Sequence, residues 1–110
     1  MHSMNAVIEN YEYLSDLTGQ MRAAATEGEW DRLVDLEKQC SARVEQMKPV
    51  DAATPIDEQT RLKKVALIRK ILADDAEVRN HTEVWMAQLQ RIMQSTRQEQ
   101  RLAQAYSSEP

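Results

Sequence analysis

Apolar residues recur at helical spacing along the second half of the chain, where neither glycine nor proline lies between Pro55 and Pro110. Spacings of three and four residues place such side chains on one face of a helix. Thr54 is a suitable cap, Pro55 suits the first helical position and Asp57 can close a capping box. The pattern predicts one long helix over about 55–96, and its apolar residues form two series: Leu62, Val65, Ile68 and Leu72, then Trp85, Leu89, Ile92 and Met93.

Two shorter helices are predicted before it, over about 5–26 and 29–48. Asn5 is a good cap for the first helix, and Gly28 suits the left-handed position that ends it. The turn is so short that the two helices must be antiparallel neighbours. Pro49 is expected to end the second helix. The apolar stripe of the first helix comprises Val7, Ile8, Tyr11, Leu14, Leu17, Met21 and Ala24 or Ala25. The expected buried stripe of the second comprises Trp30, Leu33, Val34, Cys40, Val44 and Met47.

The predicted third helix is too long to be covered by the other two. Helices of about 20 residues span roughly 30 Å, so they reach only to about Leu72 or Ala76. The polar stretch 74–82 follows, where the helix either leaves the bundle or bends. The second apolar series then needs a dimer mate, a partner protein or a short C-terminal segment, 97–108, to bury it. The expected fold is all-α: a single domain over 1–110, an antiparallel bundle of three main helices.

Composition and charge narrow the class of protein. The net charge is −4, with 12 acidic and 5 basic side chains in residues 1–58 and 6 acidic and 9 basic in residues 59–110. The basic excess of the second part is too weak for a nucleic-acid interface. Cys40 is the one cysteine, so no internal disulfide can form. No apolar run is long enough to span a membrane. We therefore expect a cytoplasmic protein without membrane insertion.

No residue pattern indicates catalysis. The sequence has no glycine-rich phosphate loop, no nucleophile with a credible base and no cluster at metal-ligand spacing. Glu77 and His81 come nearest to a di-iron motif, but their spacing is wrong and no second motif accompanies them. We predict that the chain is not an enzyme and has no catalytic residue, cofactor or metal.

Two residue clusters resemble a known family. Gly28-Glu29-Trp30-Asp31 with Leu33 follows the first amphipathic helix, and Gln94-Ser95-Thr96-Arg97-Gln98 precedes Leu102 and Ala105-Tyr106. In this order, with a proline-bearing linker and one long helix between them, they resemble the flagellar FliT family over almost the whole chain. The family comprises substrate-specific chaperones of the flagellar type III export system.

The resemblance implies partners that the residues alone do not indicate. It implies a chaperone that binds the filament-cap protein FliD, prevents its premature assembly and delivers it to the export ATPase complex and the export gate FlhA. It also implies, where the FlhDC master regulator exists, an anti-activator that binds FlhC. Arg97, Leu102, Ala105 and Tyr106 match a family segment that regulates partner access. Four residues follow Tyr106 in this sequence, so a covering C-terminal helix is expected to be short and loose.

The predicted partner-binding surface combines the second apolar series with this segment. Its chemistry suits a groove for the amphipathic helix of another protein. The alternative from another functional class is a structural or regulatory coiled-coil protein that self-associates through the long helix, which leaves a homodimer open. The candidate residues are Trp85, Met86, Leu89, Ile92, Met93, Arg97, Leu102 and Tyr106.

Overall fold

The computed structural model describes the backbone of residues 4–107 and the side chains of residues 4–105. Three helices follow one another: α1 (Met4–Glu27), α2 (Trp30–Ala53) and α3 (Glu58–Ser107). No strand occurs in this part of the chain, which confirms the all-α prediction. The chain divides into two units, residues 1–79 and 80–110, which are described separately below. That they act as a single domain stays a prediction.

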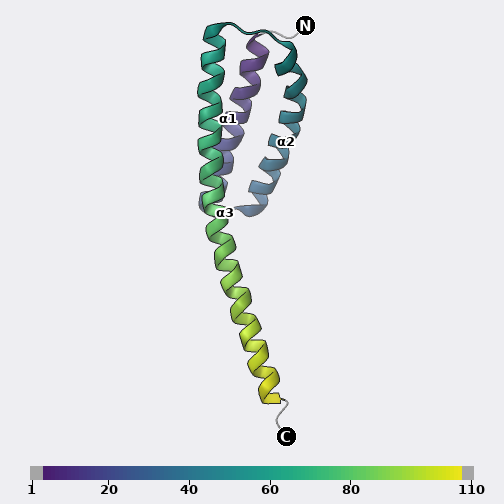
Figure 1. Cartoon of the computed structure of the whole chain (residues 1–110), viewed down its shortest axis with the longest axis vertical. Coiled ribbons are helices and arrows are strands. Elements are labelled where there is room, and N and C mark those ends of the chain that lie inside the picture. The colour runs from purple at the N-terminus through teal and green to yellow at the C-terminus, as the bar shows by residue number, and fades with distance from the viewer. Residues whose placement is uncertain (1–3, 108–110) are drawn as a thin grey trace. The chain divides into compact units, whose positions relative to one another are not determined.

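The turn between α1 and α2 depends on Gly28. Its φ of +72° lies in the left-handed region, where a side chain would be strained. The Glu29 N–H donates to the Ala24 carbonyl at 2.8 Å, and the Gly28 N–H to the Ala25 carbonyl at 3.3 Å. These two bonds form a Schellman motif, which satisfies carbonyls at the end of α1. The chain then reverses at once, so α1 and α2 lie side by side as an antiparallel hairpin (Figure 1).

The core of the first unit lies where α1, α2 and the part of α3 before Asn80 face one another. Leu36 belongs to this core although it was not in the predicted stripe, whereas Val34 and Val44 were expected there and are 49% and 37% exposed. At about 100° per residue, Val34 points well away from its neighbour Leu33. Leu62 and Leu72 of α3 are likewise exposed. The core cluster comprises Leu17, Met21, Ala24, Ala25, Leu33, Leu36 and Val78.

Both predicted boundaries of the linker between α2 and α3 were wrong. Helix α2 continues through Pro49 to Ala53, so proline removes one backbone bond there without ending the helix. Helix α3 begins at Glu58 rather than near Pro55. Asp57 is its cap, because its Oδ1 accepts from the Thr60 N–H at 2.8 Å. Thr54 is extended instead, with φ −107° and ψ 111°.

The predicted separate segment over 97–108 is also absent from the described residues, since α3 runs without a break to Ser107. Thr96 immediately precedes the segment that was expected to be separate. Its hydroxyl donates to the carbonyl of Ile92, one turn back, at 3.0 Å. A threonine that bonds backwards in this way lies inside a helix rather than at its cap. With no glycine or proline nearby, nothing ends the helix at this point.

Trp30 lies at the hairpin end of the core, as predicted, but it is only partly buried. It packs against the core cluster from the first position of α2. We expect Trp30→Ala to lower the free energy of unfolding by about 2 kcal/mol, below the roughly 3–5 kcal/mol of a fully buried aromatic residue. Urea denaturation would measure the change. A loss under about 0.5 kcal/mol, as for an ordinary surface position, would contradict this account.

Candidate partner-binding surface

The second unit carries a row of exposed apolar side chains on α3. Trp85 is 38% exposed and Ile92 63% exposed, while Leu89 between them is half-buried. Met86 and Met93 flank this row and are 47% and 48% exposed. We call these five residues the apolar face. Spacings of four and three residues put Trp85, Leu89 and Ile92 on one side of the helix. The structure therefore brings together five of the eight predicted residues.

A shallow groove runs beside this row and includes a sixth predicted residue, Arg97. The groove is lined by Met86, Leu89, Gln90, Met93, Gln94 and Arg97. No carboxylate lines it, and its single charge is the guanidinium of Arg97. Methionine side chains adapt to irregular partners, and glutamine amides can both donate and accept hydrogen bonds. The groove can hold an apolar side chain and an adjacent anion.

The last two predicted residues do not join this surface. Leu102 is 59% exposed, but at about 100° per residue it projects from a different side of α3 than Trp85. Tyr106 belongs to the helix, while its side chain lies outside the described residues. The predicted roles of Leu102 and Tyr106 stay predictions.

Exposure is continuous along the second unit. Every side chain from Gln90 to Ala105 is exposed, including those of Ile92 and Met93. A contiguous apolar patch in water is typical of an interaction site, whereas single exposed apolar residues need no explanation. Here the apolar residues lie next to one another along one side of the helix, so the apolar face is a candidate interaction site.

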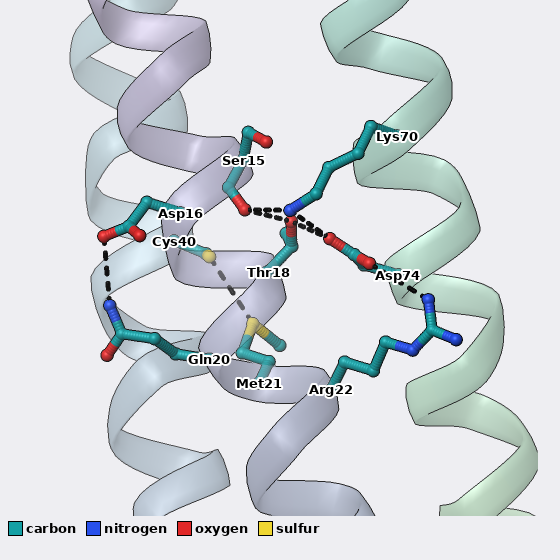
Figure 2. Close-up of polar contacts among 9 residues, drawn as sticks. All are labelled: Ser15, Asp16, Thr18, Gln20, Met21, Arg22, Cys40, Lys70 and Asp74. Carbon is teal, nitrogen blue, oxygen red and sulfur yellow. Dashed lines mark hydrogen bonds and ion pairs between the residues drawn. The ribbon is translucent and has the colours of Figure 1, made fainter.

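The polar stretch 74–82, where the helix was expected to leave the bundle or bend, is part of the first unit up to Arg79. Asp74 is 4% exposed and Val78 is 7% exposed. Figure 2 shows how α1 and α3 meet around the Asp74 carboxylate. Thr18 donates to its Oδ2 at 2.9 Å, and the Lys70 ammonium lies 2.7 Å from the same oxygen. The Arg22 guanidinium lies 3.5 Å from Oδ1.

The Asp74 carboxylate stays charged because its partners outweigh its burial. Burial alone would raise the pKa of Asp74, but hydrogen bonds from Lys70 and Thr18 and the charge of Lys70 hold it below the ordinary value. Lys70 also donates to the Ser15 carbonyl at 2.6 Å. Its ammonium would lie 3.2 Å from a Cβ at Gly19, so glycine leaves room for this contact between α1 and α3.

A second polar cluster joins the three helices near the other end of the first unit. The Asp51 carboxylate accepts from the Tyr11 hydroxyl at 2.8 Å and from Lys64 at 2.9 Å. Burial and the bond to Asp51 raise the pKa of Tyr11, and the bond to Asp51 raises the pKa of Lys64. A cavity of about 150 Å³ lies beside it, lined by Tyr11, Leu14, Val44, Met47, Lys48 and Asp51. This cluster positions α3 against the hairpin.

Among the described residues, no group of three or more histidine, cysteine, aspartate or glutamate side chains is arranged to hold a metal ion. None of their helices is both long enough and apolar enough to cross a bilayer.

Comparison with known proteins identifies the family. The family described as flagellar protein FliT matches residues 8–108. The crystal structure of flagellar protein FliT from Bordetella bronchiseptica is similar, with a TM-score of 0.70 and 30% sequence identity. The match covers 78% of this chain and 98% of that one. No match is found among curated proteins. The chain therefore belongs to the FliT family of flagellar proteins, a chaperone and not an enzyme family, and membership implies a flagellar export chaperone role.

Proposed function

We propose that this chaperone binds the filament-cap protein FliD through the apolar face of α3, prevents its premature assembly and delivers it to the export apparatus. The observation that carries the proposal is that four side chains of the apolar face are exposed to solvent on one helix: Trp85, Met86, Ile92 and Met93. A chaperone needs an accessible apolar surface that a partner's own apolar residues can cover. The family match supplies the flagellar context.

The chemistry of the groove favours an amphipathic helix as the bound segment. Such a helix presents apolar residues at spacings of three, four and seven, which match the spacing of Trp85, Leu89 and Ile92. Tryptophan is enriched among the residues that dominate binding energy, and methionine adapts to different partner side chains. Arg97 at the groove can pair with a carboxylate on the partner.

The further partners follow from the family resemblance rather than from a surface. We propose delivery of FliD to the export ATPase complex and the export gate FlhA, which places the chaperone in the cytoplasm. In bacteria that have FlhDC, we extend the proposal to an anti-activator role through FlhC. Binding assays with each purified component would test these roles one at a time, and a component that does not bind would be removed from the proposal.

Calorimetry with a peptide from the C-terminal region of FliD tests the main proposal. We expect saturable one-to-one binding by the wild-type chain, with a negative change in heat capacity because apolar surface is buried. A scrambled peptide of the same composition is the control, since it keeps the charge but loses the amphipathic spacing. Equal binding of both peptides, or of neither, would contradict a specific FliD site.

A structural coiled-coil protein is the second candidate function. The observation in its favour is the same spacing of four and three residues along Trp85, Leu89, Ile92 and Thr96, which is typical of helices that pair. The two functions differ in what covers the apolar face in the stable complex, a partner protein or a second copy of the chain. Sedimentation in the presence of the FliD peptide separates them: a chaperone yields a complex with the peptide, whereas a structural protein stays a dimer.

A further inference from the structure

We propose that Met86 and Met93 form a paired oxidation site on the apolar face, at which hydrogen peroxide converts both thioethers to sulfoxides and thereby weakens the hold on a bound partner. The oxidation concerns the second unit alone and needs no partner. Its effect on FliD rests on the proposed function. The apolar face is then a surface whose affinity depends on the supply of oxidant.

The two methionines lie close together on α3. They are seven residues apart, which is about two helical turns and about 10.5 Å along the axis, so both side chains leave the helix on nearly the same side. Both line the groove, and each is about half exposed. Of the residues that line the groove, only Met86, Leu89 and Met93 are apolar. Two of the three apolar side chains that the groove offers to a partner are therefore thioethers.

Burial protects two other methionines from an oxidant in solution. Met21 is 8% exposed and Met47 is 5% exposed, so both lie in the interior of the first unit. The Met21 sulfur also accepts a hydrogen bond from the Cys40 thiol at 3.5 Å. Conversion to the sulfoxide requires the oxidant to reach a lone pair of the sulfur. These two residues should therefore react slowly while the chain is folded.

Met4 is exposed as well, but its sulfur is engaged. The side chain is 39% exposed, and its Sδ accepts from the Asp57 N–H at 3.3 Å and from the Thr60 hydroxyl at 3.8 Å. Both donors occupy the lone pairs with which the sulfur would attack the oxidant. Among the described residues, no hydrogen bond reaches the sulfur of Met86 or Met93. The pair on the apolar face therefore combines exposure with available lone pairs.

The chemical step is an oxygen transfer. A lone pair of the thioether sulfur attacks one oxygen of hydrogen peroxide, so that an S–O bond forms and the O–O bond breaks. The departing hydroxide takes the proton from the transferred oxygen, which yields the sulfoxide and one molecule of water. The sulfur is oxidised by two electrons and the peroxide is reduced by two. Methionine sulfoxide reductases reverse the change at the expense of a dithiol, with one enzyme for each sulfoxide epimer.

Oxidation changes the apolar face without breaking α3. Gln90 lies four residues after Met86, on the same side of the helix. Arg97 bears the same relation to Met93. A sulfoxide oxygen is a strong acceptor, and these two side chains can donate to it in the unbound chain. A partner helix would have to bury that oxygen and compete for Arg97, the single charge of the groove. Oxidation therefore weakens binding while the helix stays intact.

Peptide mapping of the folded full chain tests the oxidation site without any partner. The chain is treated with dilute hydrogen peroxide, quenched at intervals and digested with trypsin, and the sulfoxide in each peptide is measured by mass spectrometry. Cleavage after Arg91 places Met86 and Met93 in separate peptides. Both should oxidise several-fold faster than Met4, and at least about tenfold faster than the two buried methionines. A pair that reacts no faster than the buried methionines would overturn the inference.

Calorimetry with the FliD peptide tests the effect of oxidation on binding. The dissociation constant of each form is compared before and after peroxide treatment. It should rise at least about tenfold for the wild type, and treatment with both sulfoxide reductases should reverse the rise. Met86→Leu combined with Met93→Leu removes both sulfurs and nearly conserves the volume, so for this double variant the ratio of the two constants should be about one. Each single variant keeps one sulfur and should give an intermediate ratio.

Met4→Leu is the matched control. It removes an exposed methionine outside the apolar face, so its binding should stay as sensitive to peroxide as that of the wild type. All forms keep Cys40, so any oxidation of the thiol is common to them. Circular dichroism checks that helix content is the same before and after oxidation.

Two results would overturn the inference. One is an oxidised wild-type chain that binds the peptide as tightly as the reduced chain, and the other is a double variant that stays sensitive to peroxide. A reduced chain that does not bind the peptide at all would count against the proposed function and the effect on FliD, whereas the mapping would still decide the oxidation site.

Discussion

Leu89→Asp should lower the affinity for a FliD C-terminal peptide by at least about a hundredfold. Leu89 is the half-buried residue at the centre of the apolar face, between Trp85 and Ile92. The variant removes an apolar contact and places a carboxylate where a bound helix would exclude water. A carboxylate that loses its hydration without a partner costs several kcal/mol, and about 1.4 kcal/mol corresponds to each factor of ten. Calorimetry at equal protein and salt concentrations measures the change.

Val84→Asp is the control for this prediction. Val84 is 59% exposed and lies on the same helix, but it points to another side of α3 from Leu89. The variant introduces the same charge and a similar helix propensity without reaching the apolar face. Its affinity should stay within about threefold of the wild type. If both aspartate variants weakened binding equally, the effect would come from charge or helix content, and the face would not be the FliD site.

Asp74→Ala should lower the free energy of unfolding by about 2–3 kcal/mol. The variant removes the buried acceptor for Thr18 and Lys70 and leaves a space between α1 and α3. A hydrogen bond to a charged group contributes about 1.5–3 kcal/mol, and Lys70 and Arg22 are half exposed, so water can hydrate them once the carboxylate is gone. Urea denaturation at neutral pH measures the change. Asp75→Ala, which removes only an exposed pair with Arg79, should cost less than about 1 kcal/mol.

The stability difference at Asp74 should also depend on pH in one direction. The folded pKa of Asp74 is lowered, so the carboxylate stabilises the folded state at pH values above the unfolded pKa of about 3.9. This stabilisation is lost as the pH falls from there through the lower folded value. The gap between the wild type and Asp74→Ala should therefore shrink on acidification. A gap that stays constant to acid pH would show that packing, and not the charge, accounts for the cost.

The sequence predicted the elements of the fold better than their ends. The hairpin followed from Gly28, because its left-handed conformation is a local property of one residue. Pro49 was misread, because a proline near the end of a helix removes only one backbone bond, and the Asp51 contacts with Tyr11 and Lys64 lie far away in sequence. The polar stretch 74–82 was expected to leave the bundle or bend, because the partners of Asp74 also lie partly far away in sequence. The nearby partner Lys70 is visible at i−4, but Thr18 and Arg22 come from another helix.

The candidate site was also predicted only in part from the sequence. The apolar face was predicted because helical spacing alone determines which side chains share a side of α3. Leu102 was grouped with the face through the family resemblance, yet it projects from another side of the helix. The two shorter helices were expected to cover the long helix only to about Leu72 or Ala76. The first unit extends to Arg79, because the pairing of Asp74 keeps a polar stretch inside it.

The long exposed stretch of α3 affects the free energy of binding a partner. From Gln90 to Ala105 each side chain faces water, so this stretch relies on its own backbone hydrogen bonds. Isolated helices of this length are only marginally stable, and their ends unwind and re-form within about a microsecond. A partner that binds the helical form must therefore offset the conformational entropy that this stretch loses when it is held as a helix. Substitutions that raise helix propensity on the solvent side, such as Ser95→Ala, would strengthen association by preorganisation, without adding a contact.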